Sequence, residues 1–302
     1  MFRWSTWFVG LVVAFSCIVS AQAGKIRVAA LNLQWFPGGT PEATDEAMTN
    51  HIALAREAVK GLDPDIFIAT EICDEIAFRN LVKDATRTEL QVLSNFSDPE
   101  EDHRFRNQQI AISSIFDPIA AWAEPWKPIM EQHRRGYSFV AVRNPSTDRL
   151  VLIYGLHLKS NRSRSPEEEQ QNYAIRDASI EQLIGHMSEM ERFFADPGID
   201  GWIIAGDFNT NHDGRFGDHV IKRLEDIGFH NTWGKTPPEK RETWKAYGNF
   251  SATTFDYIMV KGLGTPEAKL VVIDSSVSDH NAVVLEVAFP EKPAEKSSSE
   301  TD

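Results

Sequence analysis

The stretch AGDFNTNHDG at positions 205–214 carries the strongest chemical signal in the sequence, and it directly follows the apolar run GWII. Asp207 and Asn209 lie two residues apart, so an extended backbone would point both side chains the same way. Residues typical of a turn come later, from Asn211 to Gly214. The spacing therefore predicts a polar pair presented at the end of a strand, rather than a turn.

Other polar residues capable of metal or proton chemistry stand at the ends of further apolar runs. Each one alone could be a helix cap, a turn residue or a satisfied core histidine. Together with Asp207 and Asn209 they predict a carboxylate-rich site with two histidines, formed where several strands end. The additional residues are Asn32, Glu71, His157, Asp256, Asp279 and His280.

Apolar, β-rich runs must position these residues. They are typical of strands covered on one or both faces. Helices are expected over Ala43–Lys60, ended by Gly61, and over Pro166–Phe194, while Trp233–Phe250 reads as a long loop. This mixture predicts one α/β or α+β domain with a layered core. The runs cover residues 26–33, 65–72, 110–115, 137–142, 150–158, 201–206, 253–260, 269–273 and 282–289.

The two ends of the chain differ from this domain. Residues 1–23 combine Arg3, an uncharged apolar run and the pattern Ala21-Gln22-Ala23, which predicts a secretory signal peptide and a secreted or periplasmic product. An uncleaved anchor is the alternative, although the run is short for a span of ~20 residues. We expect residues 24–290 to form the domain, without stable membrane insertion, and residues 291–302 to be a disordered tail.

The charge and the cysteines limit the possible functions. The formal net charge is −13, and removing Arg3 with the signal makes it −14. This acidity argues against broad affinity for nucleic acid or anionic membranes, but it leaves room for a local basic cleft. Removal of the signal also removes Cys17, so Cys73 has no partner for a disulfide and is expected to be a small buried side chain.

Six motifs resemble, in their order, those of the endonuclease/exonuclease/phosphatase family, which includes DNase I-like nucleases. They are NLQWF, ATEI, GLHLKSN, AGDFN, FDYIMV and SDHNAV, and they span about residues 26–289. GDFN followed much later by SDH is the most specific part. The resemblance implies a four-layered α/β sandwich, with two mixed β-sheets packed face to face and helices outside. It also implies hydrolysis of phosphate esters with Mg²⁺ or a similar ion.

The same resemblance implies a role for each candidate residue. Asn32, Glu71 and Asp279 match the metal site, whose oxygen ligands favour Mg²⁺, Mn²⁺ or Ca²⁺. Asp207 and Asn209 match the pair that positions the attacking water and the phosphate. The remaining matches are a general base (His280), the carboxylate that orients it (Asp256) and a second histidine near the phosphate (His157).

Two positions depart from the nuclease pattern. DNase I-like members supply a carboxylate partner for the second histidine near residues 107–112, where this chain has only Asn107, Gln108 or Gln109. A basic residue is usual two positions before Asp256, where this chain has Thr254. Weaker candidates for contact with the substrate phosphate are Arg106, Gln108, Arg135, Lys159 and Asn161.

These features together predict a monomeric, metal-dependent phosphodiesterase, with nucleic acid as the first-choice substrate. The main alternative is a phosphatase or phospholipase C-type enzyme acting on a phosphoinositide, sphingomyelin or another phosphate ester. Aromatic residues in the 233–250 loop keep the lipid alternative open. A non-catalytic binding protein on the same fold is a lesser alternative, because every matched catalytic position is retained.

Overall fold

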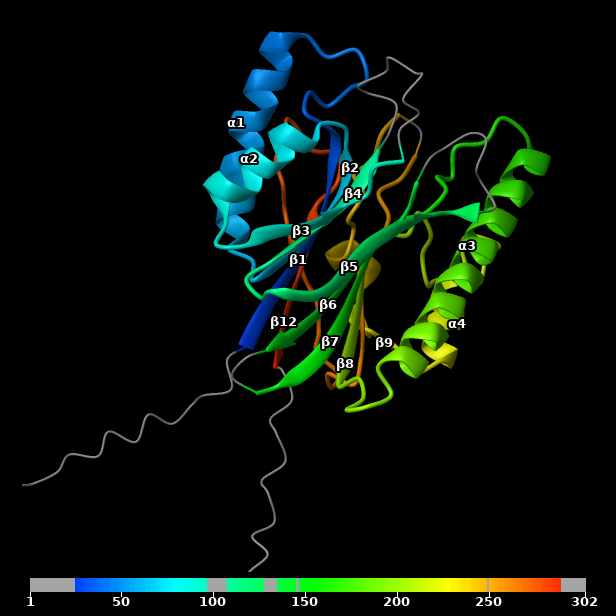
Figure 1. Ribbon diagram of the computed structural model, residues 1–302. Coiled ribbons are helices and arrows are strands. Elements are labelled where there is room, and N and C mark those ends of the chain that lie inside the picture. The colour runs from blue at the N-terminus through cyan, green and yellow to red at the C-terminus, as the bar shows by residue number, and fades with distance from the viewer. Residues whose placement is uncertain (1–24, 97–107, 128–134, 145–146, 249, 289–302) are drawn as a thin grey trace, which may run out of the picture.

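Two mixed sheets of six strands each pack face to face in the computed structural model, which describes residues 25–96, 108–127, 135–144, 147–248 and 250–288 (Figure 1). The strand order is β11-β12-β1-β2-β4-β3 in one sheet and β5-β6-β7-β8-β10-β9 in the other. Helices cover both outer faces (Figure 1). The four-layered sandwich that the resemblance implied is therefore confirmed.

The first sheet has four inner strands, with the short strands β11 and β3 at its edges. Its strands are β1 (Lys25–Phe36), β2 (Ile66–Ile72), β3 (Glu89–Leu93), β4 (Gln109–Ser114), β11 (Lys269–Val271) and β12 (Ala282–Ala288). Helices α1 (Asp45–Leu62) and α2 (Glu75–Ala85) cover its outer face (Figure 1). Apolar side chains from this face and these helices form a core cluster of their own.

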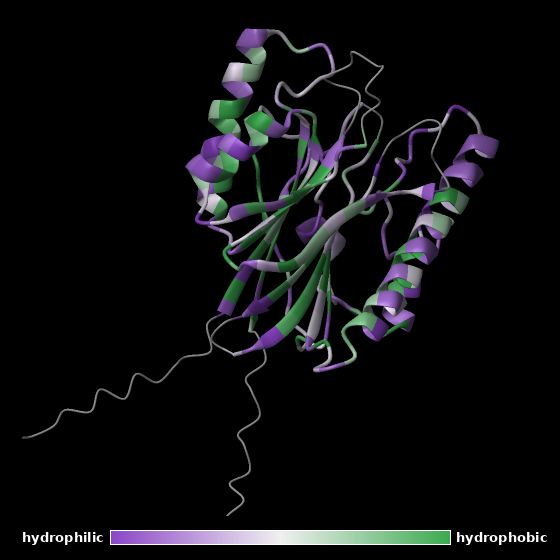
Figure 2. Cartoon of the chain, viewed as in Figure 1, coloured by the Kyte–Doolittle hydropathy of each residue, from purple (hydrophilic) through white to green (hydrophobic). Residues whose placement is uncertain are grey.

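The second sheet is covered by α3 (Pro166–Phe193) and α4 (Val220–Asp226) (Figure 1). Its strands are β5 (Pro118–Pro125), β6 (Gly136–Asn144), β7 (Arg149–His157), β8 (Gly201–Asp207), β9 (His230–Asn231) and β10 (Asp256–Lys261). A larger core cluster joins this sheet, its helices and the inner face of the first sheet. Figure 2 shows hydrophobic residues along much of the strands, whereas hydrophilic and hydrophobic residues alternate along the helices.

Local sequence signals explain where the helices begin. Thr44, Asp74 and Ser165 each accept a hydrogen bond from a backbone N–H in the first turn of α1, α2 and α3. The expected end of α1 at Gly61 is wrong by a small margin. The helix continues to Leu62 and ends at Asp63, which adopts the left-handed conformation (φ 43°).

The ends of the chain, including the expected signal peptide and tail, lie outside the described residues. Within the described part, no helix combines the length and the apolar character needed to cross a bilayer. The expected 233–250 loop is irregular apart from the short 3₁₀ helix η2 (Pro238–Lys240) and isolated bridges.

Candidate active site

Strand register in the second sheet aligns three candidate residues. Asp207 is the cross-strand partner of His157 on parallel β7 and of Asp256 on antiparallel β10. Directly opposed residues send their side chains to the same face of a sheet. The register therefore gathers two carboxylates and an imidazole at one end of these three neighbouring strands.

The first sheet brings Asn32 and Glu71 to the same place. The Asn32 amide nitrogen donates to Glu71 Oε1 at 3.1 Å and to Asp207 Oδ2 at 3.1 Å. One buried amide thus bridges a carboxylate of its own sheet and a carboxylate of the other. The face-to-face packing of the sheets is what creates the site.

His280 forms a close pair with Asp256, as the resemblance implied. Its Nδ1 lies 2.7 Å from Asp256 Oδ2, and its Nε2 lies 3.9 Å from Asp207 Oδ2. Burial by itself would lower the pKa of His280, but the Asp256 carboxylate and its acidic neighbours outweigh burial and raise the pKa to about 10. Asp256 therefore fixes the ring orientation and leaves Nε2 facing the site.

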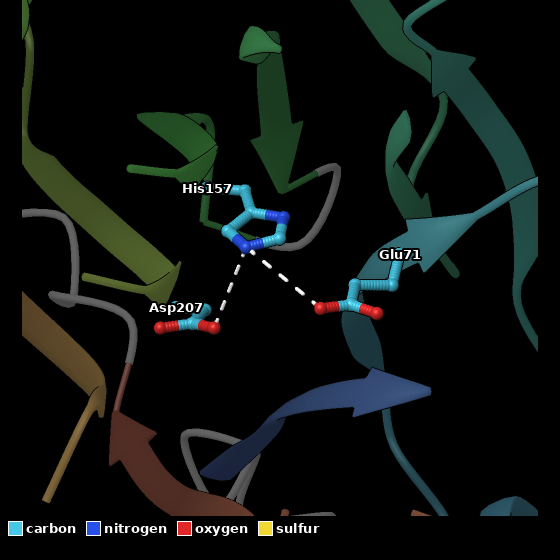
Figure 3. Close-up of side chains that lie close together, drawn as sticks. All are labelled: Glu71, His157 and Asp207. Atoms are coloured by element: carbon cyan, nitrogen blue, oxygen red, sulfur yellow. Dashed lines mark ion pairs between the residues drawn. The ribbon is translucent and has the colours of Figure 1, made fainter. Parts of the chain in front are cut away.

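His157 approaches the other side of Asp207. Figure 3 shows its Nε2 directed between Asp207 and Glu71, at 3.5 Å from Asp207 Oδ2 and 4.0 Å from Glu71 Oε1. Asp207 thus stands between the two histidines, each of which belongs to a separate cluster of acidic and imidazole groups around it.

The negative charge of this site suits a hard divalent cation. Burial raises the pKa of Asp207 to about 7, and the Asp256 carboxylate acts in the same direction. Buried carboxylates that oppose one another's ionisation are stabilised by a cation between them. Glu71 and Asp207, with the Asn32 amide between them, offer the oxygen-rich surroundings that Mg²⁺, Mn²⁺ or Ca²⁺ prefers.

Asp279, the third predicted metal ligand, lies at the rim. Its side chain is 42% exposed, and its Oδ1 is 4.0 Å from His280 Nε2. The Trp244 indole donates to its Oδ2 at 3.2 Å. The structure places Asp279 beside the base, but outside both compact groups of possible metal ligands.

The extended backbone expected through Asn209 is wrong. Strand β8 ends at Asp207, whose Oδ1 accepts a hydrogen bond from the Asn209 backbone N–H at 2.9 Å, and Asn209 adopts φ 52°. An Asx turn therefore follows the strand at once, because aspartate readily bonds the backbone two residues on. Both side chains remain buried at the site.

Left-handed backbone is concentrated around this centre. Of the six described residues other than glycine that adopt positive φ, four lie at the site, namely Gln34, Trp35, Glu71 and Asn209, and two lie elsewhere, namely Asp63 and Asp148. Three of these backbones donate to side chains of the site. Asn209 N–H bonds the Asp207 carboxylate, Trp35 N–H donates to Glu71 Oε2 at 3.0 Å, and Gln34 N–H donates to Asn32 Oδ1 at 2.9 Å. Strain of this kind is often retained where a functional geometry requires it.

The weaker phosphate candidates are not all placed alike. Arg135 donates to the Leu158 carbonyl at 3.1 Å and to the Gln108 side chain, so both residues lie beside the end of β7. Asn161 donates to the Asn209 carbonyl. Lys159 is half-buried, and Arg106 lies outside the described residues.

The two departures from the nuclease pattern have structural counterparts. The Gln108 carbonyl accepts from Arg135, whereas the Gln109 carbonyl accepts from Ser94. At the position of the missing basic residue, the Thr254 hydroxyl accepts from the Arg241 guanidinium at 2.9 Å. A basic group is therefore supplied there by a residue 13 positions away in sequence.

Several supporting residues were not identified from the sequence. The Gln34 side chain accepts from Asp279 N–H at 2.8 Å, and the Ser278 hydroxyl donates to the Asn32 carbonyl at 2.6 Å. Thr243 accepts from the backbone N–H of Asp256 at 2.9 Å. Gln34 and Ser278 lie inside the NLQWF and SDH motifs, so those motifs could have indicated both residues. No local sequence pattern indicates a role for Thr243.

Cys73 and Trp233 differ from expectation in detail. Cys73 is half-buried rather than buried, and burial together with Glu71 raises the pKa of its thiol, which disfavours a nucleophilic thiolate. Trp233 is buried, so only Trp244, Tyr247 and Phe250 remain as accessible aromatic residues of the loop.

Solved structures with low sequence identity share this fold. The human nocturnin catalytic domain with bound sulfate has 17% identity and a TM-score of 0.64, covering 88% of this chain and 95% of its own. An endonuclease/exonuclease/phosphatase from Bacteroides vulgatus has 10% identity and a TM-score of 0.65, covering 88% and 100%. TDP2 from C. elegans has 17% identity and a TM-score of 0.59, covering 87% and 75%.

No curated protein sequence matches the chain. The sequence profile of the endonuclease/exonuclease/phosphatase family, by contrast, matches residues 29–280, a span that includes every site residue from Asn32 to His280. With the two-sheet fold and the gathered carboxylates and histidines, this match shows that the chain belongs to the endonuclease/exonuclease/phosphatase family.

Proposed function

We propose that this protein is a metal-dependent phosphodiesterase and that nucleic acid is its substrate. The observation that supports the proposal most strongly is the His280–Asp256 pair, held at 2.7 Å with Nε2 facing Asp207. In its neutral form, an oriented imidazole beside buried carboxylates is suited to deprotonating a water for attack on phosphorus. A cation bound to these carboxylates would favour the neutral form, because it offsets the negative charge that raises the pKa of His280.

The chain's own groups divide the chemistry between them. Glu71 and Asp207, which the Asn32 amide nitrogen bridges, would hold the cation, with Asp279 nearby. When bound, the cation would supply Lewis-acid polarisation of a phosphoryl oxygen. Asp256 keeps the His280 ring oriented, so Nε2 is the atom that takes the proton. His157 and Asn209 lie on the opposite side of Asp207, where they can contact the phosphate.

A substrate panel tests this proposal. Plasmid DNA, RNA, a phosphoinositide and sphingomyelin are each incubated with the protein and Mg²⁺, with Asp256→Asn as the matched control. We expect hydrolysis of DNA or RNA that the control lacks. If neither DNA nor RNA is hydrolysed but a lipid is, the proposed substrate is wrong. The proposed metal-dependent hydrolysis of a phosphate ester would still stand.

A lipid phosphate ester is the second candidate, because the 233–250 loop exposes aromatic rings. Tyr247 and Phe250 are 75% and 67% exposed, and they exchange backbone hydrogen bonds at the tip of a hairpin. The Trp244 backbone at the base of this hairpin bridges to His280. Exposed aromatic residues next to a site suit either stacked bases or a lipid interface, and the panel separates the two.

We further propose that the protein is exported as a monomer after removal of residues 1–23. The support is the uncharged apolar run followed by Ala21-Gln22-Ala23. N-terminal sequencing of the exported protein should begin at Gly24. A product that begins at Met1 and remains in the membrane contradicts this proposal.

A further inference from the structure

His51 is a buried histidine in the first half of α1, and no step of the proposed chemistry uses it. Both of its ring nitrogens are bonded to backbone groups. Its Nδ1 accepts from the Gly38 N–H at 2.7 Å, and its Nε2 lies 2.7 Å from the Val277 carbonyl oxygen. One ring on the outer helix layer therefore joins two segments from opposite ends of the domain's sequence.

These two hydrogen bonds fix the tautomer and the charge of the ring. A backbone N–H can only donate, so Nδ1 is the unprotonated nitrogen and Nε2 carries the proton that the Val277 carbonyl accepts. Burial lowers the pKa of His51, although the bond to Val277 acts in the opposite direction. The Phe36 ring packs edge-on against the imidazole, with the ring centroids 5.5 Å apart. His51 is therefore held as a neutral ring with one acceptor and one donor.

Both backbone partners of His51 border motifs that carry the site. Gly38 lies just after the NLQWF motif, which contains Asn32, and Val277 immediately precedes the SDH motif, which contains His280. The two motifs are also bonded to each other. The Ser278 hydroxyl donates to the Asn32 carbonyl at 2.6 Å and accepts from the His280 N–H at 2.9 Å. His51 thus holds, from outside the site, the two segments that meet within it.

The bond to Val277 lies where a tight turn leads into the base. The N–H groups of Val277 and Ser278 both donate to the Asp274 carbonyl, at 2.9 and 3.2 Å. The Val277 carbonyl and the Ser278 N–H belong to one planar peptide group. That plane is therefore held on both sides, by His51 at its oxygen and by Asp274 at its N–H, and the next hydrogen bond along the chain is that of Ser278 to His280.

We infer that His51 is a positioning residue for the general base His280 and acts through the peptide group between Val277 and Ser278. This inference rests on the proposed phosphodiesterase function. Without the bond to Val277, the SDH segment can shift relative to Asp256, and a shift of about 1 Å at a reacting group can cost ~10²-fold in rate. The loss should fall on kcat rather than KM, because the buried ring is not accessible to a substrate.

Three substitutions separate the two bonds of His51, with bis(p-nitrophenyl) phosphate and Mg²⁺ in the assay. His51→Leu removes both bonds and should lower kcat by roughly 10–10² with KM nearly unchanged. Glutamine extends about as far as Nε2, so His51→Gln keeps a donor for Val277 and should retain most of the wild-type kcat. Asparagine extends only about as far as Nδ1, so His51→Asn keeps an acceptor for Gly38, loses the bond to Val277 and should resemble His51→Leu.

His186→Leu is the matched control, because it makes the same change in another buried helix histidine. His186 lies on α3, on the other side of the molecule's core, where it bonds the Tyr154 hydroxyl at 2.9 Å. The control should lower the melting temperature, since that hydroxyl loses its partner, and leave kcat near the wild type. Circular dichroism establishes that each variant is folded at the assay temperature.

Wild-type kcat in a folded His51→Leu overturns the inference. An equal loss of kcat in His186→Leu also overturns it, because the effect would then be general loosening of the fold. If His51→Leu does not fold, equal kcat values in His51→Gln and His51→Asn overturn it instead. All of these outcomes leave the proposed function in place as long as the wild type hydrolyses the diester, whereas an inactive wild type removes both.

Discussion

Asp207 is the residue on which the two halves of the site meet. It lies 3.5 Å from His157 Nε2 and 3.9 Å from His280 Nε2, and Asn32 links it to Glu71. The histidines nevertheless have different surroundings. His280 has a carboxylate at 2.7 Å that fixes its ring, whereas His157 approaches its acidic neighbours less closely.

This difference predicts unequal effects of the two histidines on catalysis. His280→Ala should lower kcat/KM by ~10²–10⁴, the usual range for loss of a positioned general base, and Asp256→Asn should act through the wrong ring orientation. His157→Ala should lose less, partly through KM. All three are compared by steady-state kinetics, with melting temperatures as the folding control. Equal losses in well-folded His157→Ala and His280→Ala would contradict the asymmetry.

Buried histidines away from the site predict a pH effect on stability. His186 on α3 is surrounded by aromatic rings, and its Nδ1 lies 2.9 Å from the Tyr154 hydroxyl. Burial lowers its pKa, and the nearby Glu124 and Glu189 oppose this shift without reversing it. The ordinary pKa of a histidine is 6.5, so as the pH falls below 6.5 the unfolded chain binds this proton more readily than the folded protein. The free energy of unfolding therefore falls with the pH.

His186→Gln should reduce this acid sensitivity, because glutamine keeps an acceptor for Tyr154 but does not titrate. Urea unfolding at pH 7 and pH 5 measures the effect. The fall in the free energy of unfolding between these pH values should be smaller in the variant. An equal fall in both proteins would show that other groups account for it.

At the scale of elements, Gly206 allows β7 and β8 to pair closely enough to align His157 with Asp207. It adopts φ 134°, and a Cβ there would lie 2.1 Å from the Leu156 carbonyl oxygen. Gly206→Ala should therefore lower the free energy of unfolding by about 2–4 kcal/mol. Gly185→Ala, in open space on α3, is the control and should raise stability by ~0.5–1 kcal/mol. Similar urea midpoints for both variants would refute this account.

Helix α3 connects the loops that follow β7 and β8 through a buried ion pair. The Arg176 guanidinium bonds Asp218 Oδ2 at 2.6–2.8 Å and the Lys159 carbonyl at 2.9 Å, and the Thr210 hydroxyl donates to Asp218 Oδ1 at 2.7 Å. Replacing both charged partners with apolar residues often leaves stability unchanged. Removing only one partner leaves the other charge buried without compensation, which is strongly destabilising. The pair can therefore be tested for a role in positioning these loops.

Arg176→Ala should lower the free energy of unfolding by about 3–5 kcal/mol. Arg176→Met combined with Asp218→Leu should restore most of that stability but leave kcat reduced, because the loops lose their shared anchor. Urea unfolding and kcat are measured on the same preparations. Wild-type kcat in the stable double variant would show that the ion pair does not position the loops.

Sequence patterns predicted the elements that carry the site, because their apolar runs are long and nearly continuous. The matching strands are β1, β2, β4, β6, β7, β8, β10, β11 and β12. Strand β5 was missed because it is a largely exposed edge strand with proline at both ends. Strands β3 and β9 and helices α2 and α4 were missed because they are short. None of these elements contributes a predicted catalytic residue.

What the sequence could not predict depends on contacts between distant segments. The turn at Asn209 arises because Asp207 bonds its backbone N–H, and the guanidinium next to Thr254 comes from Arg241 on the loop. The Arg135–Gln108 contact joins the residues just before β4 and β6. Residue types and their spacing in the sequence indicated which residues form the site. The contacts between distant segments that orient those residues could be seen only in the folded structure.

At the scale of the whole molecule, charge is distributed in a way that suits the proposed chemistry. The chain is acidic overall, at −13, and its site is acidic too. Two basic residues, Arg135 and Lys159, lie near the site on the His157 side. We therefore expect substrate affinity to depend on this small basic region and on the bound cation rather than on the general surface.

The requirement for a cation is tested most directly by hydrolysis of bis(p-nitrophenyl) phosphate after dialysis against a chelator, before and after addition of Mg²⁺. The proposed site, with Glu71 and Asp207 held together by Asn32, should be inactive in the chelator and regain its turnover with Mg²⁺ or Mn²⁺. Mg²⁺ should also raise the melting temperature, since it binds only the folded site. Full turnover in excess chelator would contradict the account.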